Sequence, residues 1–300
     1  MDLEKRIFFH DNSARLPSEN LAINQAIVDL VNDGDYEAVV RIYSHKNGVI
    51  LGRNESREDI NVDYCTKQGY EIVNRSSGGS AIFVTPELTL CYSVFANLRK
   101  TKLEENVTNI YKKFTLPLAK KLGDNFVVEG SYYLKAKLNG ASHPFAGHAM
   151  RLYKHCVQFD GVVHKKKFDL DILARIIKLR ELHRINEDSY ILMHGDIYDL
   201  KGNKILNAVL SSSTLVKRER DELEKTQNFD SLGLDENIYL NCLYESFSET
   251  FEGLKKIEKL DCDNEIVRDY KNKIKRVREG KIVGLGHCFV DFMEPEPVIN

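Results

Sequence analysis

The sequence lacks several patterns that would assign a function at once. Its six cysteines include no CxxC pair, so no two of them offer neighbouring thiolates to one metal ion. No apolar run approaches the ~20 residues that cross a bilayer, and the charged start MDLEKRIFF does not resemble a signal peptide. The formal net charge is only -2. We therefore expect a soluble cytoplasmic protein with reduced thiols that binds neither nucleic acid nor membrane.

The chain is nevertheless large enough to fold around a substantial core. It has 300 residues, of which 42% are hydrophobic, which allows one large domain with an appendage or two domains. Apolar residues at helical spacing predict a helix after Leu16, with Ser18 as its N-cap, and a long amphipathic helix over 101–123, bent at Pro117 and capped by Gly123.

Strand patterns alternate irregularly with these helices. Strands are expected over 36–44, 47–52, 70–75 and 87–95, and several shorter strands and turns follow between 126 and 164. This order favours an α+β domain over a doubly wound sheet. We place that domain at 1–235 and a charged, helical C-terminal extension at 236–300, in which KIVGLGHCFVDF could form a closing strand.

The segment NRSSGGSAIF (74–83) carries the main functional signal. Paired glycines allow positive φ angles and let backbone N–H groups approach a ligand without an intervening Cβ. Consecutive amides in such a turn can bind an anion, with hydroxyls from Ser77 or Ser80 and a bidentate cation from Arg75. The simpler alternative is a tight hairpin whose glycines serve turn geometry alone. No GK[ST] follows and no GxGxxG occurs, so a P-loop is not indicated.

Residues 45–94 resemble the N-terminal half of the lipoate-protein ligase and octanoyltransferase family. The family pattern, roughly VVxLGR followed by RRxSGGxAVxHDxELTYS, is matched by Gly52-Arg53, by Glu87-Leu88-Thr89 and by the glycine segment. The resemblance implies the mixed sheet of biotin/lipoate ligases, flanked by helices. It also implies that the loop holds the acyl chain and adenylate through Arg75, Ser77, Gly78, Gly79, Ser80 and Ala81.

A second motif of the family, K-[IV]-[SA]-G-x-A, is matched in spacing by PFAGHA (144–149). Here the resemblance implies that Gly147 and Ala149 shape the opposite wall of the site. Three polar positions of the family differ in this register: the lysine is replaced by Pro144, the histidine after the glycine loop by Val84, and the histidine before Gly161 by Asp160.

A proline cannot supply the charge of the family's lysine, which stabilises the transition state electrostatically. KLNGAS puts Lys137 in a second motif-like register, and we take it as the candidate catalytic residue. Lys204, which a Gly-Asn hairpin turn explains more simply, and Lys154 are further alternatives.

The cysteines and histidines of the sequence do not indicate a nucleophilic or a metal-binding site. The acyl-thioester mechanism of some family members needs a cysteine upstream of the hairpin, and NFVVEGSYY contains none. Cys156 fits a buried structural thiol. Four histidines between 143 and 164 match no zinc spacing, so we expect no metal site.

The resemblance implies a lipoate-protein ligase or octanoyl/lipoyl transferase. Its substrate would be lipoate or octanoate, with ATP and Mg²⁺ if it is a ligase. Its partner would be a lipoyl carrier domain, either glycine-cleavage H protein or the acyl-carrying subunit of a 2-oxoacid dehydrogenase. The three departures keep open a second reading, a degenerate pseudoenzyme that binds an acyl group or carrier without turnover. A plain interaction module with a charged tail is the third.

Overall fold

The computed structural model describes residues 5–103, 106–129, 133–167, 169–176 and 226–257, and the backbone of four strands between 182 and 206. The cysteines at 262 and 288 and the expected closing strand over 281–292 lie outside these residues.

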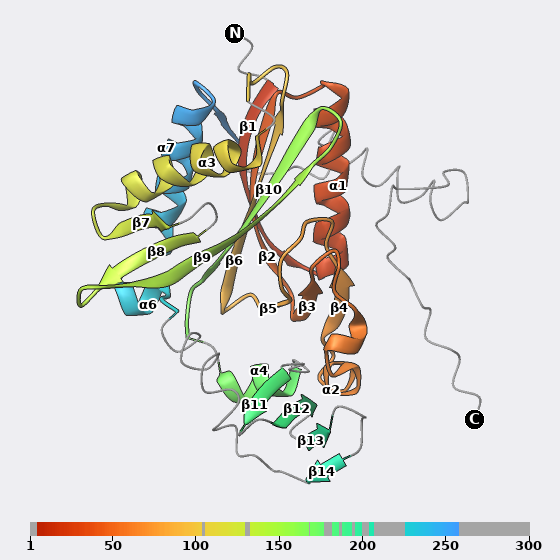
Figure 1. Cartoon of the computed structure of the whole chain (residues 1–300). Helices are drawn as coiled ribbons and strands as arrows, with labels where there is room; N and C mark the ends of the chain where they lie inside the picture. The colour runs from red at the N-terminus through yellow and green to blue at the C-terminus, as the bar shows by residue number, and fades with distance from the viewer. Residues whose placement is uncertain are drawn as a thin grey trace, which may run out of the picture.

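An eight-stranded mixed sheet forms the centre of the protein (Figure 1). Two strand pairs at one edge are parallel, and the remaining pairs are antiparallel. In sheet order the strands are β15 (Lys255–Ile257), β1 (Arg6–Arg15), β2 (Ala38–His45), β6 (Thr89–Asn97), β10 (Cys156–His164), β9 (Ala141–Leu152), β8 (Tyr133–Leu138) and β7 (Phe126–Glu129).

Two smaller sheets accompany the central one. The first contains the strands on either side of the glycine segment and has the order β4 (Glu71–Asn74), β3 (Gly48–Leu51) and β5 (Ile82–Val84). The second is an antiparallel meander of β11 (Leu182–Ile185), β12 (Asp188–Met193), β13 (Asp196–Asp199) and β14 (Lys204–Leu206).

The helices are short apart from three. The complete set of α-helices in the described residues is α1 (Pro17–Asp33), α2 (Val62–Lys67), α3 (Val107–Leu122), α4 (Leu170–Ile176), α6 (Phe229–Leu232) and α7 (Glu236–Thr250). A 3₁₀ turn, Arg57–Asp59, precedes α2.

Helix α1 begins one residue before the predicted cap. Pro17 occupies its first turn, where its missing N–H is not needed, and Leu16 is the N-cap. The prediction for Ser18 was therefore wrong, because its hydroxyl donates to Glu71 Oε1 at 2.6 Å. Gly34 ends the helix in the left-handed region, at φ 90°, as a C-cap glycine does.

The two faces of the central sheet are covered by different helices (Figure 1). One face packs with α3 and α7 in a core that includes Phe114, Phe159 and Phe247. The other face packs with α1 around Ile27, Val39 and Phe95. Helix α3 continues through Pro117 without interruption. The predicted α+β fold, a mixed sheet flanked by helices, is confirmed.

The expected boundary at residue 235 does not separate two hydrophobic cores. Tyr239, Leu243 and Phe247 of α7 are fully buried in the same core as the sheet and α3. After this helix the chain returns to the sheet, where β15 pairs in parallel with β1. The described residues beyond 235 therefore belong to the main domain.

Candidate active site

The glycine loop connects β4 to β5 and lies directly against the end of β3. A Cβ built on Gly52 would lie 1.8 Å from the carbonyl oxygen of Gly79, so only glycine permits this approach. Gly79 itself has φ +90°, which favours glycine, whereas a Cβ on Gly78 would meet nothing within 4 Å. Gly52-Arg53 and Gly78-Gly79, which are more than twenty residues apart in the sequence, thus pack against each other.

Arg75 holds the loop in this shape. Its Nε and Nη2 donate to the Gly78 carbonyl at 3.1 and 2.6 Å, and Nη2 also donates to Ser80 O at 2.9 Å. Its Nη1 donates to Ile50 O at 3.1 Å. Burial lowers the pKa of this guanidinium. The bidentate role predicted for Arg75 therefore needs correction, because most of its donors bind backbone carbonyls.

The backbone N–H groups of the loop are not used in the same way. Within the described residues, neither Gly78 nor Gly79 donates its N–H to a carbonyl. Gly79 and Ser80 are exposed. The loop is therefore rigidly held through its carbonyl groups and its arginine while these amides stay free for a ligand.

A cavity of about 300 Å³ opens beside this loop. That volume lies at the lower end of the roughly 300–1,000 Å³ typical of small-molecule sites. It lies where the glycine loop, the start of α1 and strands β2, β3, β5, β6, β9 and β10 meet. Its walls are mainly apolar or small, with a few polar groups. The lining residues are Leu21, Tyr43, His45, Ile50, Arg75, Gly79, Ser80, Ala81, Ile82, Cys91, Gly147, His148, Ala149, Asp160, Gly161 and Val162.

The predicted ligand residues divide into two groups. Arg75, Gly79, Ser80, Ala81, Gly147 and Ala149 all line this cavity. Ser77 instead is 1% exposed and donates its hydroxyl to Asp160 Oδ2 at 2.8 Å, and Gly78 contributes the carbonyl that Arg75 binds.

Two titratable groups on the wall are held neutral by burial. Burial, reinforced by the Arg41 charge, lowers the pKa of His45 to about 3. Its Nδ1 lies 3.1 Å from the Asn20 amide nitrogen, which can only donate, so His45 carries its proton on Nε2. Burial, followed by the nearby Asp160 charge, raises the pKa of the Cys91 thiol to about 12. Cys91 is therefore not a thiolate nucleophile at neutral pH.

Asp160 is the carboxylate of the cavity wall. Ser93 Oγ donates to its Oδ1 at 2.7 Å, and Ser77 Oγ donates to its Oδ2. Gln158 Nε2 donates to both oxygens, at 2.9 and 3.1 Å. The glycine loop is thus tied to β10 by a side chain that also faces the ligand space.

A buried polar network continues from this carboxylate towards α1. The Tyr43 hydroxyl lies 3.0 Å from Ser93 Oγ, and Asn24 Nδ2 donates to both of these oxygens. Arg41, which is fully buried, donates to Asn24 Oδ1 at 2.7 Å and to Asp11 Oδ2 at 3.1 Å. These hydrogen bonds therefore link the cavity wall to helix α1 and strand β1. A single apolar substitution in the network would leave some of its buried polar groups without a partner.

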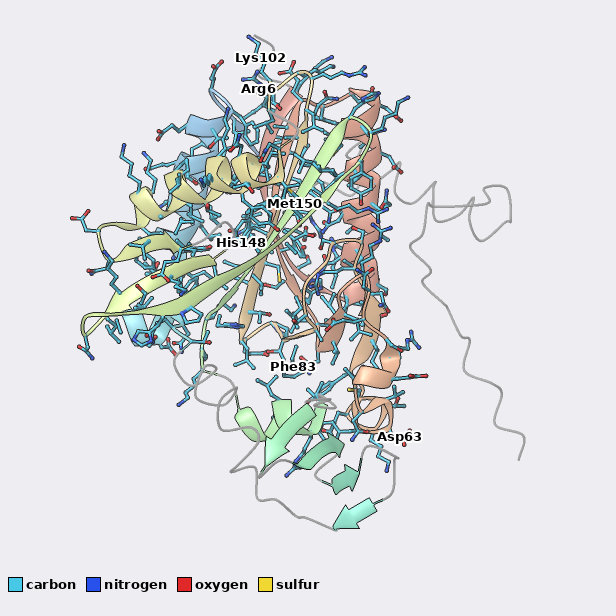
Figure 2. The ribbon with its side chains drawn as sticks, in the orientation of Figure 1. Arg6, Asp63, Phe83, Lys102, His148 and Met150 are labelled. Atoms are coloured by element: carbon cyan, nitrogen blue, oxygen red, sulfur yellow. The ribbon has the colours of Figure 1, made fainter. Side chains whose placement is uncertain are left out.

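Gly161 is required by the aromatic ring that crosses it. A Cβ there would lie 2.1 Å from Tyr92 Cζ. The Tyr92 hydroxyl reaches His148 Nε2 at 2.6 Å, and the His148 ring stacks on Phe159. Figure 2 shows His148 and Met150 along the middle of β9. This contact fixes the strand that carries Gly147 and Ala149.

The structure does not bring Lys137 to the cavity. It is exposed on β8, opposite Ser142 and beside the Asn139-Gly140 turn, whose φ angles are 50° and 79°. Ser142 precedes Gly147 by five residues of β9, or about 17 Å of strand. The catalytic assignment of Lys137 is corrected accordingly, because its motif-like spacing belongs to a hairpin turn. Lys154 is also exposed, and the side chain of Lys204 lies outside the described residues.

The three positions at which the sequence departs from the family pattern have different environments. Val84 is fully buried and packs with Ile50 and Val73. Pro144 is exposed on β9, where its carbonyl accepts from Gln227 N. Asp160 lies in the cavity wall.

Sequence reasoning missed the cavity roles of Tyr43, His45, Cys91 and Asp160. One signal was present: Cys91 and Ser93 alternate with large apolar residues along β6, which marks a strand face turned towards polar groups. Cys156 is fully buried, and burial raises its pKa, which fits the predicted structural thiol.

Two negative findings apply to the residues that the structure describes. No group of His, Cys, Asp and Glu among them is arranged to hold a metal ion. None of their helices is both long and apolar enough to span a membrane.

A mixed sheet flanked by helices, with a glycine loop beside a mainly apolar cavity, is the arrangement of a domain with a small-molecule site. The sequence model described as the lipoyl protein ligase A/B catalytic domain matches residues 16–188. The chain belongs to this family.

Individual relatives agree with that assignment. The chain is 27% identical over 261 residues to octanoyltransferase LipM of Lysinibacillus sphaericus, covering 84% of this chain and 87% of the relative. It is 28% identical to the octanoyl-[GcvH]:protein N-octanoyltransferase of Geobacillus kaustophilus over 34% of this chain and 37% of that one. A solved bipartite lipoate protein ligase of Thermoplasma acidophilum, studied with its E2 lipoyl domain, superimposes with a TM-score of 0.67. It shares 17% identity over 90% of this chain and 91% of that chain, a likeness of fold.

Proposed function

We propose that this protein transfers an octanoyl or lipoyl group to a lysine of a lipoyl carrier domain. The observation that carries the proposal is the cavity beside the glycine loop, with apolar walls and free loop amides at its edge. Each methylene of an acyl chain buried there would contribute about 0.8 kcal/mol. The amides of Gly78 and Gly79 would donate to the acyl carbonyl or to an adjoining phosphate.

The names of the relatives support the acceptor. The name of one relative describes transfer of an octanoyl group from GcvH to protein, and the solved ligase was studied with an E2 lipoyl domain, so both names concern lipoyl carrier proteins. The acceptor of this protein would accordingly be glycine-cleavage H protein or the lipoyl domain of a 2-oxoacid dehydrogenase, in the cytoplasm.

The acyl donor distinguishes a ligase from a transferase. A ligase would take free lipoate or octanoate with ATP and Mg²⁺, and the ion would be held mostly by phosphate oxygens and water. A transferase would take a preformed acyl donor.

The test is an acyl-transfer assay on the full chain, read by the mass of a purified lipoyl domain or H protein. One arm supplies octanoate or lipoate with ATP and Mg²⁺, a second supplies the octanoyl- or lipoyl-adenylate, and a third supplies octanoylated H protein. Acylation in any arm supports the proposal, and the arm identifies the donor. Tight adenylate binding in a calorimeter without transfer in any arm would instead select a non-catalytic binding protein.

A further inference from the structure

A carboxylate is the unexpected group in a cavity that would hold an uncharged acyl chain. Asp160 lies on β10 directly opposite Ala149 of β9, and Val162 of β10 lies opposite Gly147. Because alternate residues of a strand share one face, the side chains of Asp160, Val162 and Ala149 point to the same side of the sheet, the side that Gly147 leaves without a side chain. That side carries the cavity.

The Asp160 carboxylate is fixed in position in the cavity wall. Ser77, Ser93 and Gln158 orient it with three donor atoms, none of them cationic. The other groups that face it are Arg75, Tyr43 and Cys91. The hydrogen bonds of Arg75 go to backbone carbonyls, and burial raises the pKa of both Tyr43 and Cys91, which keeps them uncharged.

The neighbouring strand β9 leaves room beside Asp160 for a second substrate. A Cβ on Gly147 would lie 3.6 Å from Val162 Cγ1, an ordinary contact, so packing within the protein does not require glycine there. Gly147 is exposed and Ala149 is half-exposed. The missing side chain therefore widens the entrance towards the carboxylate.

We propose that Asp160 binds the ε-ammonium group of the acceptor lysine and accepts a proton from its nitrogen during acyl transfer. This inference rests on the proposed function. Lysine has a pKa of about 10.4 in water, so it arrives charged and must lose one proton before its lone pair can attack. The carboxylate forms a charge-assisted hydrogen bond with the arriving ammonium and aligns it with the acyl carbon.

The step balances without an additional reactant. The amine nitrogen forms the new C–N bond, and the bond between the acyl carbon and the leaving group breaks, with its electron pair going to the leaving group. The first ammonium proton passes to the Asp160 carboxylate and on to solvent, which frees the lone pair, and after the attack the second nitrogen proton passes to the leaving group or to solvent. An amide and a protonated or anionic leaving group are the products.

Two nucleophiles of different charge separate this role from a structural one. Octanoyl-adenylate is supplied to the full chain, and transfer is measured to a lipoyl domain, whose lysine is cationic, and to hydroxylamine, which is neutral at pH 7. We expect Asp160→Asn to reduce transfer to the lipoyl domain by about 10- to 100-fold, the value of a hydrogen bond to a charged group. Transfer to hydroxylamine should stay within about threefold, because this nucleophile arrives uncharged and needs neither an ion pair nor the removal of a proton before it attacks.

Two matched variants act as controls. Ser93→Ala removes one donor to the same carboxylate and leaves its charge, so it should affect the lipoyl domain much less than Asp160→Asn does. Asp160→Glu keeps a carboxylate and should restore part of the transfer to the lipoyl domain. If circular dichroism shows that Asp160→Asn does not fold, Asp160→Glu is measured in its place. A loss of transfer to hydroxylamine without a loss of transfer to the lipoyl domain would then count against the role of Asp160.

The outcomes separate the two proposals. Equal losses with both nucleophiles, or no loss with either, would overturn the role of Asp160 and leave the acyltransferase intact. No transfer by the wild-type protein from any of the three acyl donors, to either nucleophile, would overturn the proposed function and this inference with it.

Discussion

Gly52 and Gly79 touch backbone to backbone, with the Gly79 carbonyl oxygen 1.8 Å from where a Gly52 Cβ would stand. This contact joins the end of β3 to the glycine loop. It is reinforced by the bond from Arg53 N to Ser77 O at 2.9 Å. The loop that borders the cavity thus depends on a residue that does not itself line it.

Gly52→Ala should displace the glycine loop. The added methyl overlaps main-chain atoms, so we expect a loss of about 1–3 kcal/mol in the free energy of unfolding, measured by urea titration, and weaker adenylate binding. Gly78→Ala is the matched control, because a Cβ there meets nothing within 4 Å. Equal stability of the two variants would show that the close contact is not retained in solution.

Arg75→Lys should destabilise the loop although it preserves the charge. A lysine cannot reproduce the fork that binds the carbonyls of Ile50, Gly78 and Ser80. The expected loss is about 2 kcal/mol or more in unfolding free energy, since buried carbonyls lose charged donors. If the lysine variant keeps full stability but binds adenylate weakly, the arginine acts on the ligand, as the sequence suggested.

Lys137→Ala should leave acyl transfer within about twofold of the wild-type rate, because the side chain is exposed beside a hairpin turn. The measurement is the initial rate of acylation of a lipoyl domain. A loss of an order of magnitude or more would restore Lys137 as the catalytic lysine and would mean that the hairpin moves to the cavity.

His45 should make stability depend on pH. Its folded-state pKa of about 3 lies below the unfolded value of 6.5, so the unfolded chain binds more protons between these values. The free energy of unfolding therefore falls as the pH drops from 6.5 towards 3, by up to about 1.4 kcal/mol per pH unit for one group. His45→Gln should reduce that slope in urea titrations from pH 7 to 4. An unchanged slope would mean that His45 is charged in the folded protein.

The sequence predicted the fold better than it predicted the site. Apolar runs marked β2, β6 and β10, and helical spacing marked α1 and α3. Strand β1 was missed because only its first residues are apolar and its partners, β2 and β15, are distant in sequence. β5 was missed because three residues carry little periodicity.

Motif spacing located the glycine loop, but side-chain partners depend on tertiary contacts. Nothing in the sequence shows that the donors of Arg75 would turn towards carbonyls, since these groups meet only when β3 lies beside the loop. Asp160 and Ser77 are 83 residues apart and are joined by a side-chain hydrogen bond between β10 and the glycine loop. Lys137 matched a motif that local turn chemistry produces equally well.

The return of the chain to the sheet at β15 has a practical consequence for protein engineering. A shortened protein ending at residue 235 would lose α7, baring aromatic rings that now fill one side of the sheet. It would also leave β1 as an edge strand with unpaired N–H and C=O groups, a template for association between molecules. A minimal expressible fragment must therefore extend at least through Ile257.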